Sequence, residues 1–263
     1  MSTQTVSNGT PCWYELATSD LAGAGDFYSE VLGWDVAGES AMEGFDYRLG
    51  GPSGAMVAGL MDNAMMGGAP PAWRMYFTAT GVDAAVQAVT AAGGSVLQPA
   101  ADIPGTGRFA VVADSQGAVF GLLQPDTSQP TPAVGAFDQS RAGHGNWHEL
   151  MTTDPEAAFA FYQGLFGWET SAEMEMPGDM GTYRIFSHRG TDIGGMMGLG
   201  NAPMPTWLPY FGVDGVTEAI TRIEGGGGTT HHGPHAVPGG AHVAICTDPQ
   251  GAWFAIVGPL NRS

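Results

Sequence analysis

The chain contains no lysine and is poor in positive charge altogether. Its eight basic residues, all of them arginines, stand against 26 acidic residues, for a formal net charge of −18 over 263 residues. The absence of lysine excludes Schiff-base chemistry through a side-chain amine. A surface that binds a phosphate backbone needs clustered Lys and Arg, so we expect no nucleic-acid partner.

Cysteines and long apolar runs are also scarce. The two cysteines, Cys12 and Cys246, lie far apart without a C-x-x-C motif, which argues against a disulfide framework or a cysteine-based zinc site. No apolar run approaches the roughly 18 residues needed to span a bilayer. The stretch from Met1 to Gly9 has no basic segment followed by an apolar one, as a signal peptide would. The sequence therefore predicts a soluble cytoplasmic protein without a membrane partner.

Glycine, by contrast, is abundant. The 42 glycines indicate many tight turns or close backbone contacts. Apolar residues make up 43% of the chain, which is typical of a globular protein. Its length is sufficient for two ordinary domains, each with a core of its own.

The sequence also repeats itself. Residues 13–36 and 147–170 share the frame Trp-x-Glu-Leu-x-Thr-x-Asp, followed by Phe-Tyr and Gly-Trp. Farther along, residues 73–125 align with 207–259 without a gap. Such self-similarity is the signature of a duplicated structural unit.

The segment between the two copies has a different composition. Residues 126–143 are rich in Pro, Ser, Thr and Gly, which is typical of a linker. We therefore predict one domain over residues 1–125, a linker over 126–143 and a second copy of the domain over 144–263.

Each copy is expected to contain a strand, a helix and further strands, twice over. In the first copy, alternation over residues 13–18 indicates a half-buried strand, Asp20 supplies a helix N-cap and Gly33 suits a left-handed helix end. A second strand and helix begin at Arg74, with a turn at 114–117 before the last strand. The remaining expected elements are strands near 47–49, 55–60, 95–98, 109–113 and 118–123, and a helix that carries Val82, Ala85, Val86 and Val89 on one face.

This order of elements resembles the glyoxalase/bleomycin-resistance/extradiol-dioxygenase superfamily, also called the vicinal oxygen chelate superfamily. Two motifs carry the resemblance in both copies: the strand–Asp–helix opening from Thr18 to Trp34, and the Asp-x-Gln-Gly-x-x-Phe hairpin from Asp114 to Phe120. The Trp-x-Glu-Leu start is similar to that of a tandem two-domain "glyoxalase-like" subgroup. The resemblance implies an α+β fold in which four βαβββ modules form two tandem half-open curved-sheet barrels.

The resemblance also implies where a metal would be held. Metal-dependent members use four residues, usually His, Gln or Glu, from four strands. In this sequence the four positions fall on Trp13, about Gly59, about Arg74 and Gly121, and in the second copy on Trp147, about Gly195, about Leu208 and Ala255. None of these is a plausible ligand for a divalent metal. We therefore predict no metal site and no cofactor, with a divalent metal bound by unconventional ligands as the alternative.

Two glutamates are the candidate catalytic residues. Glu15 and Glu149 lie two positions after Trp13 and Trp147, so in each copy both residues share one face of the first strand. Three roles remain open for each glutamate: a metal ligand, a general base, or the partner of a nearby arginine.

Other duplicated residues are candidates for ligand binding. We expect Trp13, Trp147, Tyr76 and Tyr210 to face inward as aromatic walls, or else to be ordinary core. Arg48 and Arg184, each preceded by Tyr, would clamp an anionic ligand or close a structural salt bridge. Arg74 would join Glu15 if each copy closes its own pocket, or Trp147 and Glu149 if modules pair across copies.

All seven histidines lie in the second copy, and three of them form the cluster His231-His232-Gly-Pro-His235. A solvated histidine-rich loop is the simpler interpretation of this cluster, although it could bind zinc or nickel.

Three functions are compatible with these observations. The first is a metal-independent protein that binds a small metabolite or antibiotic in an aromatic-lined pocket, any chemistry being proton transfer by Glu15 or Glu149. The second is a metal-dependent glyoxalase-type lyase or dioxygenase, and the third a non-catalytic, ligand-sequestering protein of the resistance type. The partner would be a small molecule, and the chain a monomer with an internal pseudo-dimer or a homodimer.

Overall fold

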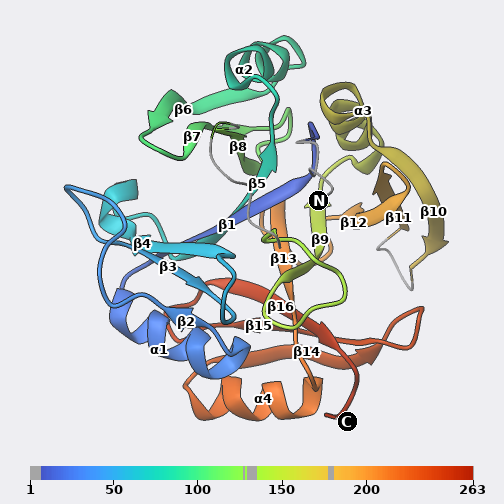
Figure 1. The fold of residues 1–263 in the computed structure, drawn as a ribbon. Helices are drawn as coiled ribbons and strands as arrows, with labels where there is room; N and C mark the ends of the chain where they lie inside the picture. The colour runs from blue at the N-terminus through green and yellow to red at the C-terminus, as the bar shows by residue number, and fades with distance from the viewer. Residues whose placement is uncertain (1–6, 127, 129–134, 177–180, 263) are drawn as a thin grey trace. The chain divides into compact units, whose positions relative to one another are not determined.

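A computed structural model describes residues 7–126, 128, 135–176 and 181–262 (Figure 1). Within these residues the chain forms four modules of the order strand, helix and three strands. The first two are β1 (Pro11–Thr18), α1 (Leu21–Leu32), β2 (Asp35–Val36), β3 (Tyr47–Gly51), β4 (Ala58–Asp62), and then β5 (Ala72–Thr78), α2 (Val82–Ala91), β6 (Ser95–Ile103), β7 (Gly107–Ala113), β8 (Val119–Pro125). A short 3-10 helix, η1 (Asn63–Met66), lies between them.

The second copy repeats this order. Its modules are β9 (Gly145–Thr152), α3 (Pro155–Phe166), β10 (Glu169–Glu175), β11 (Thr182–His188), β12 (Thr191–Gly198), and then β13 (Thr206–Gly212), α4 (Val216–Gly225), β14 (Thr229–Ala236), β15 (His242–Thr247), β16 (Trp253–Gly258). The predicted fold class, α+β with four βαβββ modules, is confirmed. Residues 127 and 129–134 of the predicted linker over 126–143 lie outside the described residues.

The strands form two mixed eight-stranded sheets that curve without closing into barrels. The strand orders are β2-β3-β4-β1-β5-β8-β7-β6 and β10-β11-β12-β9-β13-β16-β15-β14. In each module the first strand pairs in parallel with the last, for example β1 with β4 and β5 with β8, whereas the remaining neighbours are antiparallel. A parallel pair needs a crossover between its strands, and each module's helix provides it.

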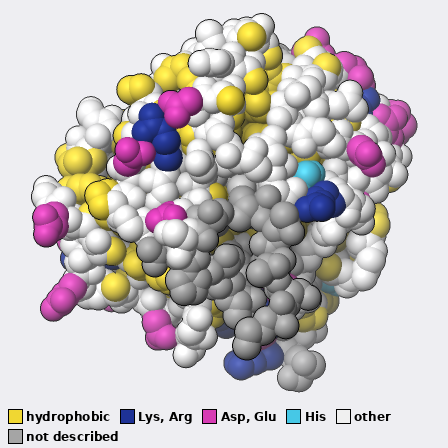
Figure 2. Space-filling view, turned by 45° about the horizontal axis from the view of Figure 1, so that its top comes forward, with side chains coloured by type: hydrophobic (Ala, Val, Ile, Leu, Met, Phe, Trp, Pro, Cys, Tyr) yellow, Lys and Arg dark blue, Asp and Glu magenta, His cyan; other side chains and the backbone are white. Residues whose placement is uncertain are grey.

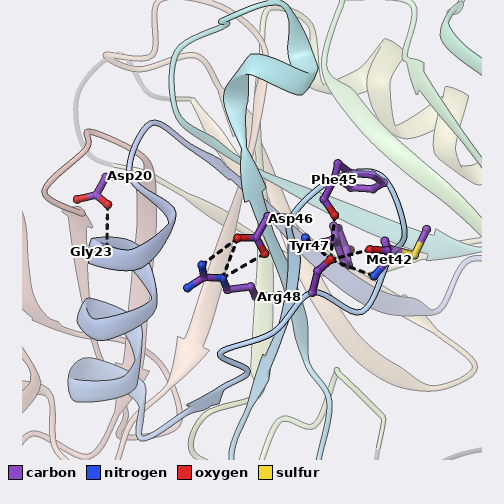
Figure 3. Close-up of polar contacts among 8 residues, drawn as sticks. Asp20, Gly23, Met42, Phe45, Asp46, Tyr47 and Arg48 are labelled. Carbon is purple, nitrogen blue, oxygen red and sulfur yellow. Dashed lines mark hydrogen bonds and ion pairs between the residues drawn. The ribbon is translucent and has the colours of Figure 1, made fainter.

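The helices begin and end where the sequence predicts. Asp20 accepts a hydrogen bond from the Gly23 amide at 3.0 Å (Figure 3). Asp154 does the same for the Ala157 amide. Gly33 ends α1 at φ 68°, a left-handed conformation that favours glycine. Three elements differ from expectation: β2 and η1 carry no clear periodicity, and β4 begins at Ala58 because residues before it form a turn.

The compact units of the structure do not coincide with the repeats. Apart from residues at strand ends, one unit combines the second module with the third, and the other combines the first module with the fourth. In the second of these units α1 and α4 contact each other, and in the first α2 contacts α3. The question that the sequence left open, whether modules of different copies pack together, is therefore answered.

A buried tyrosine network joins the modules inside each unit. The Tyr28 hydroxyl on α1 donates to Asp248 Oδ2 in the hairpin before β16 at 3.0 Å and accepts from Trp73 Nε1 at 2.9 Å. The other carboxylate oxygen of Asp248 accepts the amides of Gln250 and Ala252, so the turn itself is part of the network. The motif residues Phe-Tyr and Asp-x-Gln-Gly thus connect one copy to the other.

A network of the same residue types, Tyr, Asp and Trp, joins the modules of the other unit. Tyr162 on α3 donates to Asp114 at 3.0 Å and accepts from Trp207 at 3.0 Å. Buried aromatic rings surround both tyrosines, among them Trp168, whose ring centroid lies 5.3 Å from that of Tyr162. Such pairs contribute about 0.5–1.5 kcal/mol each beyond the area they bury.

The surface carries scattered acidic side chains. On the face drawn in Figure 2, magenta acidic groups are distributed among uncharged ones. Several arginines form ion pairs with nearby carboxylates. Arg108 is an example, since it forms ion pairs with Asp83 at 2.9 Å and Asp102 at 2.7 Å. Among the described residues no helix is long and apolar enough to cross a membrane.

Candidate functional site

In the first copy, Trp13, Glu15 and Tyr47 form a connected polar group. Trp13 Nε1 donates to the Tyr47 hydroxyl at 2.9 Å, and this hydroxyl donates to Glu15 Oε2 at 3.3 Å. Trp13 and Glu15 share one face of β1, as the alternation predicts. All three side chains are half-buried rather than exposed.

Tyr47 is placed by the loop that precedes it. Ser40 Oγ accepts hydrogen bonds from the amides of Met42 and Tyr47 and lies within 2.8 Å of the Phe45 carbonyl, so it closes the loop at the start of β3 (Figure 3). The register then pairs Tyr47 with Met61 on β4, next to Gly59. A serine with several backbone partners restricts where the tyrosine ring can go.

The ring of Tyr47 lies directly over Gly59. A Cβ atom added to Gly59 would come within 2.0 Å of the tyrosine hydroxyl oxygen and 2.1 Å of Cζ, a distance that real side chains do not tolerate. Gly59 is also the Cα partner of Glu15 across the β1–β4 pair. The tyrosine ring therefore fills the space beside Glu15 that a side chain at position 59 would otherwise take.

The second copy repeats this arrangement. Glu149 is buried, with 8% of its surface exposed, and its Cα partner on β12 is Gly195. A Cβ at Gly195 would meet the ring of Tyr183 at 2.1 Å. Trp147, two positions before Glu149, shares its face of β9 and is half-buried.

Tyr76 and Tyr210, predicted to face inward, are both buried. The ring of Tyr76 covers Gly121, its partner on β8, where an added Cβ would lie 2.0 Å from the ring. Tyr210 is partnered by Ala255 on β16 in the same register. Arg74 Nη1 lies 3.5 Å from the Tyr76 hydroxyl, so this arginine and this tyrosine are brought together.

Arg48 and Arg184 lie on the strand faces opposite to those of Tyr47 and Tyr183. Arg48 is partnered by Leu60 and pairs with Asp46 at 2.8 Å, as Figure 3 shows. Arg184 forms ion pairs with Glu173 at 2.7 Å and with Glu156 of α3, and its guanidinium lies over the ring of Phe159. These contacts are those of the predicted structural salt bridge rather than of a clamp on an anionic ligand beside Glu15 or Glu149.

The sequence reasoning missed the importance of Tyr47 and Tyr183. It noted the duplicated Tyr-Arg pair but assigned the role to the arginine. Strand alternation permits only one of two adjacent residues to share the face of the glutamate, and the register assigns that face to the tyrosine. The signal in the sequence is a tyrosine and a glycine that are both duplicated, two positions out of register on neighbouring strands.

Several nearby groups have altered acidities. Burial raises the pKa of the Cys12 thiol to about 12, so this residue is not a thiolate nucleophile at neutral pH. Burial likewise lowers the pKa of His148 to about 4, although its hydrogen bond to the Ile193 carbonyl opposes the shift. His148 lies on the face of β9 opposite Glu149, so it is not part of the same group.

The residues present do not fit the family's usual metal. Among the eight positions expected to hold ligands, none carries His, Gln or Glu, and at Gly59, Gly195 and Gly121 tyrosine rings occupy the space that a ligand side chain would need. Within the described part of the chain no cluster of three or more His, Cys, Asp or Glu residues could hold a metal ion. The histidines of β14 are among the residues to which this applies.

The fold defines a class of protein with tandem βαβββ modules, and the candidate site residues recur on each curved sheet. The model of the Glyoxalase/Bleomycin resistance protein/Dioxygenase superfamily matches residues 12–122 and 144–256, and the chain belongs to this family.

The chain is similar to two relatives and one solved structure in particular. A Mycobacterium bovis protein named "Putative glyoxylase CFP32" is 33% identical over 97% of this chain and 96% of its own length. The "Anthracycline biosynthesis protein DauV" of a Streptomyces species is 28% identical over 95% of this chain and 93% of its own length. The Mn(II)-bound glyoxalase from Novosphingobium aromaticivorans has a TM-score of 0.65 at 15% identity and matches 97% of this chain and 83% of its own, which shows the fold alone.

Proposed function

We propose that the chain binds a small carbonyl-bearing or partly aromatic metabolite or antibiotic beside Glu15 and Glu149, without the metal of its family, and that any chemistry there is proton transfer by these carboxylates. The observation that carries this proposal is the packing of Tyr47 over Gly59 and of Tyr183 over Gly195. In both copies a tyrosine ring fills the space that a metal-binding side chain would need, and this ring lies next to a carboxylate.

The geometry supports a base whose position is fixed by its neighbours. The Tyr47 hydroxyl, itself held by Trp13, donates to Glu15, and such a hydrogen bond orients a carboxylate and favours its charged form. A carboxylate in this state can accept a proton from a carbon next to a carbonyl group. As Glu15 takes up that proton, the single Tyr47 hydroxyl hydrogen is released from the carboxylate and can be donated to a developing oxyanion.

The names of the two relatives support the proposal that the ligand is a small molecule. One refers to a glyoxylase and the other to anthracycline biosynthesis, and both concern small organic molecules. The relatives cover nearly the full length of this chain, so the similarity extends over both copies of the repeat.

The test combines metal analysis with proton exchange. Untagged protein, purified without a nickel resin, is expected to carry well under one metal ion per chain. In D₂O the protein should accelerate exchange of the C–H protons of hydroxyacetone, and Glu15→Gln with Glu149→Gln should lower that rate by about 10²–10⁴-fold with little change in binding. Glu39→Gln, an exposed glutamate on the loop before β3, is the matched control.

Three outcomes decide the proposal. Stoichiometric metal that survives dialysis and is needed for exchange would overturn metal independence. Glutamate variants that exchange as fast as the parent would overturn the assignment of the base. Binding of hydroxyacetone without exchange would instead favour a non-catalytic, sequestering function.

A further inference from the structure

Trp253 is the most exposed tryptophan of the chain. Half of its surface is open to solvent, whereas the other six tryptophans are buried or half-buried. Leaving a large aromatic ring in water forgoes the free energy of burying it, so an isolated exposed tryptophan on a strand is unfavourable unless it has a partner.

His231 holds the indole of Trp253 in place. The two ring centroids are 4.3 Å apart with the planes 29° from parallel, and the imidazole Nε2 lies 3.0 Å from Thr247 Oγ1. Thr247 is in turn the cross-strand partner of Trp253. The position of the stacked pair is therefore fixed by the β15–β16 ladder and by His231 of β14. A ring that is already ordered loses little conformational entropy when it binds a ligand.

The pair lies on the face of the sheet that carries Tyr210, one of the candidate ligand-binding residues. Trp253 precedes Ala255 by two residues on β16, so both point to the same side. Ala255 is the register partner of Tyr210 on β13 and of Ile245 on β15. Of these three residues Ile245 is half-buried and so continues the apolar surface beside the aromatic pair, whereas Tyr210 and Ala255 are buried.

The first copy lacks this feature at the equivalent positions. Leu97 and Val119 stand there, exposed at 56% and 36%, and neither offers a ring face. The tyrosine is shared, but Tyr76 covers Gly121 whereas Tyr210 is partnered by Ala255. Of the two copies, therefore, only the second has a stacked aromatic pair at these two positions.

We propose that His231 and Trp253 form an aromatic platform, specific to the second copy, that binds the flat face of a planar aromatic ligand. A planar ring system can stack on the exposed part of the indole and cover the half-buried Ile245 beside it, whereas a saturated ring of the same carbon skeleton is puckered and cannot stack in this way. This inference rests on the proposed function only for the choice of the sheet face, and it requires neither Glu149 nor proton transfer.

The experiment compares 2-naphthol with decahydro-2-naphthol, which has the same skeleton without aromatic rings. Nuclear magnetic resonance of the full chain resolves the indole N–H signals, and the Trp253 signal is assigned by its loss in Trp253→Val. We expect 2-naphthol to shift the Trp253 signal. Calorimetry should show its affinity to fall about 5–10-fold in His231→Leu/Trp253→Val, in line with the strength of a single aromatic stack.

This double variant is a conservative one, because it installs the pair that the first copy already tolerates. The reciprocal change, Leu97→His/Val119→Trp, is expected to add a second binding event for 2-naphthol. Melting temperatures of both variants report whether the fold is retained.

Equal binding of the two compounds, or 2-naphthol shifts confined to other indoles, would overturn the platform. The Glu15→Gln/Glu149→Gln protein separates this result from the proposed function. If it binds 2-naphthol at Trp253 like the parent and also exchanges hydroxyacetone like the parent, the base assignment fails and the platform stands. If 2-naphthol leaves the Trp253 signal of the parent chain unchanged while the parent exchanges hydroxyacetone, the platform fails and the proposed function stands.

Discussion

Acid should destabilise the protein through His148. The imidazole is completely buried on β9, where Nδ1 donates to the Ile193 carbonyl at 2.6 Å and the ring faces Phe77 with centroids 6.4 Å apart. Burial lowers its pKa from 6.5 to about 4, because the charged form would lose its hydration. The folded protein therefore keeps this residue neutral where the unfolded chain would protonate it.

The sign and size of the effect follow from this difference. Because the folded pKa is below the unfolded one, the stabilising contribution is complete above pH 6.5 and is lost as the pH falls from 6.5 through 4. A difference of about 2.5 pKa units corresponds to about 3 kcal/mol of unfolding free energy at 1.36 kcal/mol per unit. Asp248 acts in the opposite direction, since burial raises its pKa and its contribution is lost as the pH rises.

The measurement is urea-induced unfolding of the parent and of His148→Gln between pH 8 and pH 4. Taking the difference between the two proteins cancels Asp248 and all other groups they share. At pH 8 the difference reports only the packing of the new side chain, and it should then shift in favour of the variant by about 3 kcal/mol on going to pH 4. A difference that does not change with pH would refute the assignment of a buried, neutral histidine.

Two further changes test the packing. Tyr28→Phe leaves Asp248 and Trp73 without the hydroxyl between them and should lower the unfolding free energy by about 1–3 kcal/mol by calorimetry. Met204→Ala, at an exposed methionine, is the control, and an unchanged melting temperature of Tyr28→Phe would contradict the prediction. Gly121→Ala places a Cβ against the ring of Tyr76 and should cost about 1–3 kcal/mol, which Tyr76→Ala in the same chain should relieve, so that a non-additive double-mutant cycle is the expected result and additivity the contrary one.

The candidate site was predictable in part. Trp13 and Glu15 share a face of β1 because alternation along a strand is a local property, and the structure has them joined through Tyr47. The part played by Tyr47 was not predictable from its own strand, because it depends on which residue of β4 lies opposite. Arg48 illustrates the same limit, since being next to Tyr47 in sequence puts it on the other side of the sheet.

The sequence by itself determined the duplication, the order of elements in each module and the helix ends at Asp20 and Gly33. These depend on composition, on periodicity and on hydrogen bonds between residues a few positions apart. Only the tertiary structure decided that modules of different copies pack together, through pairs such as Tyr28 with Asp248, and that a tyrosine ring covers the glycine beside each glutamate. Those outcomes depend on strand register and on contacts between distant segments, for which a repeated sequence offers two equally matched partners, and the packing of buried side chains selects between them.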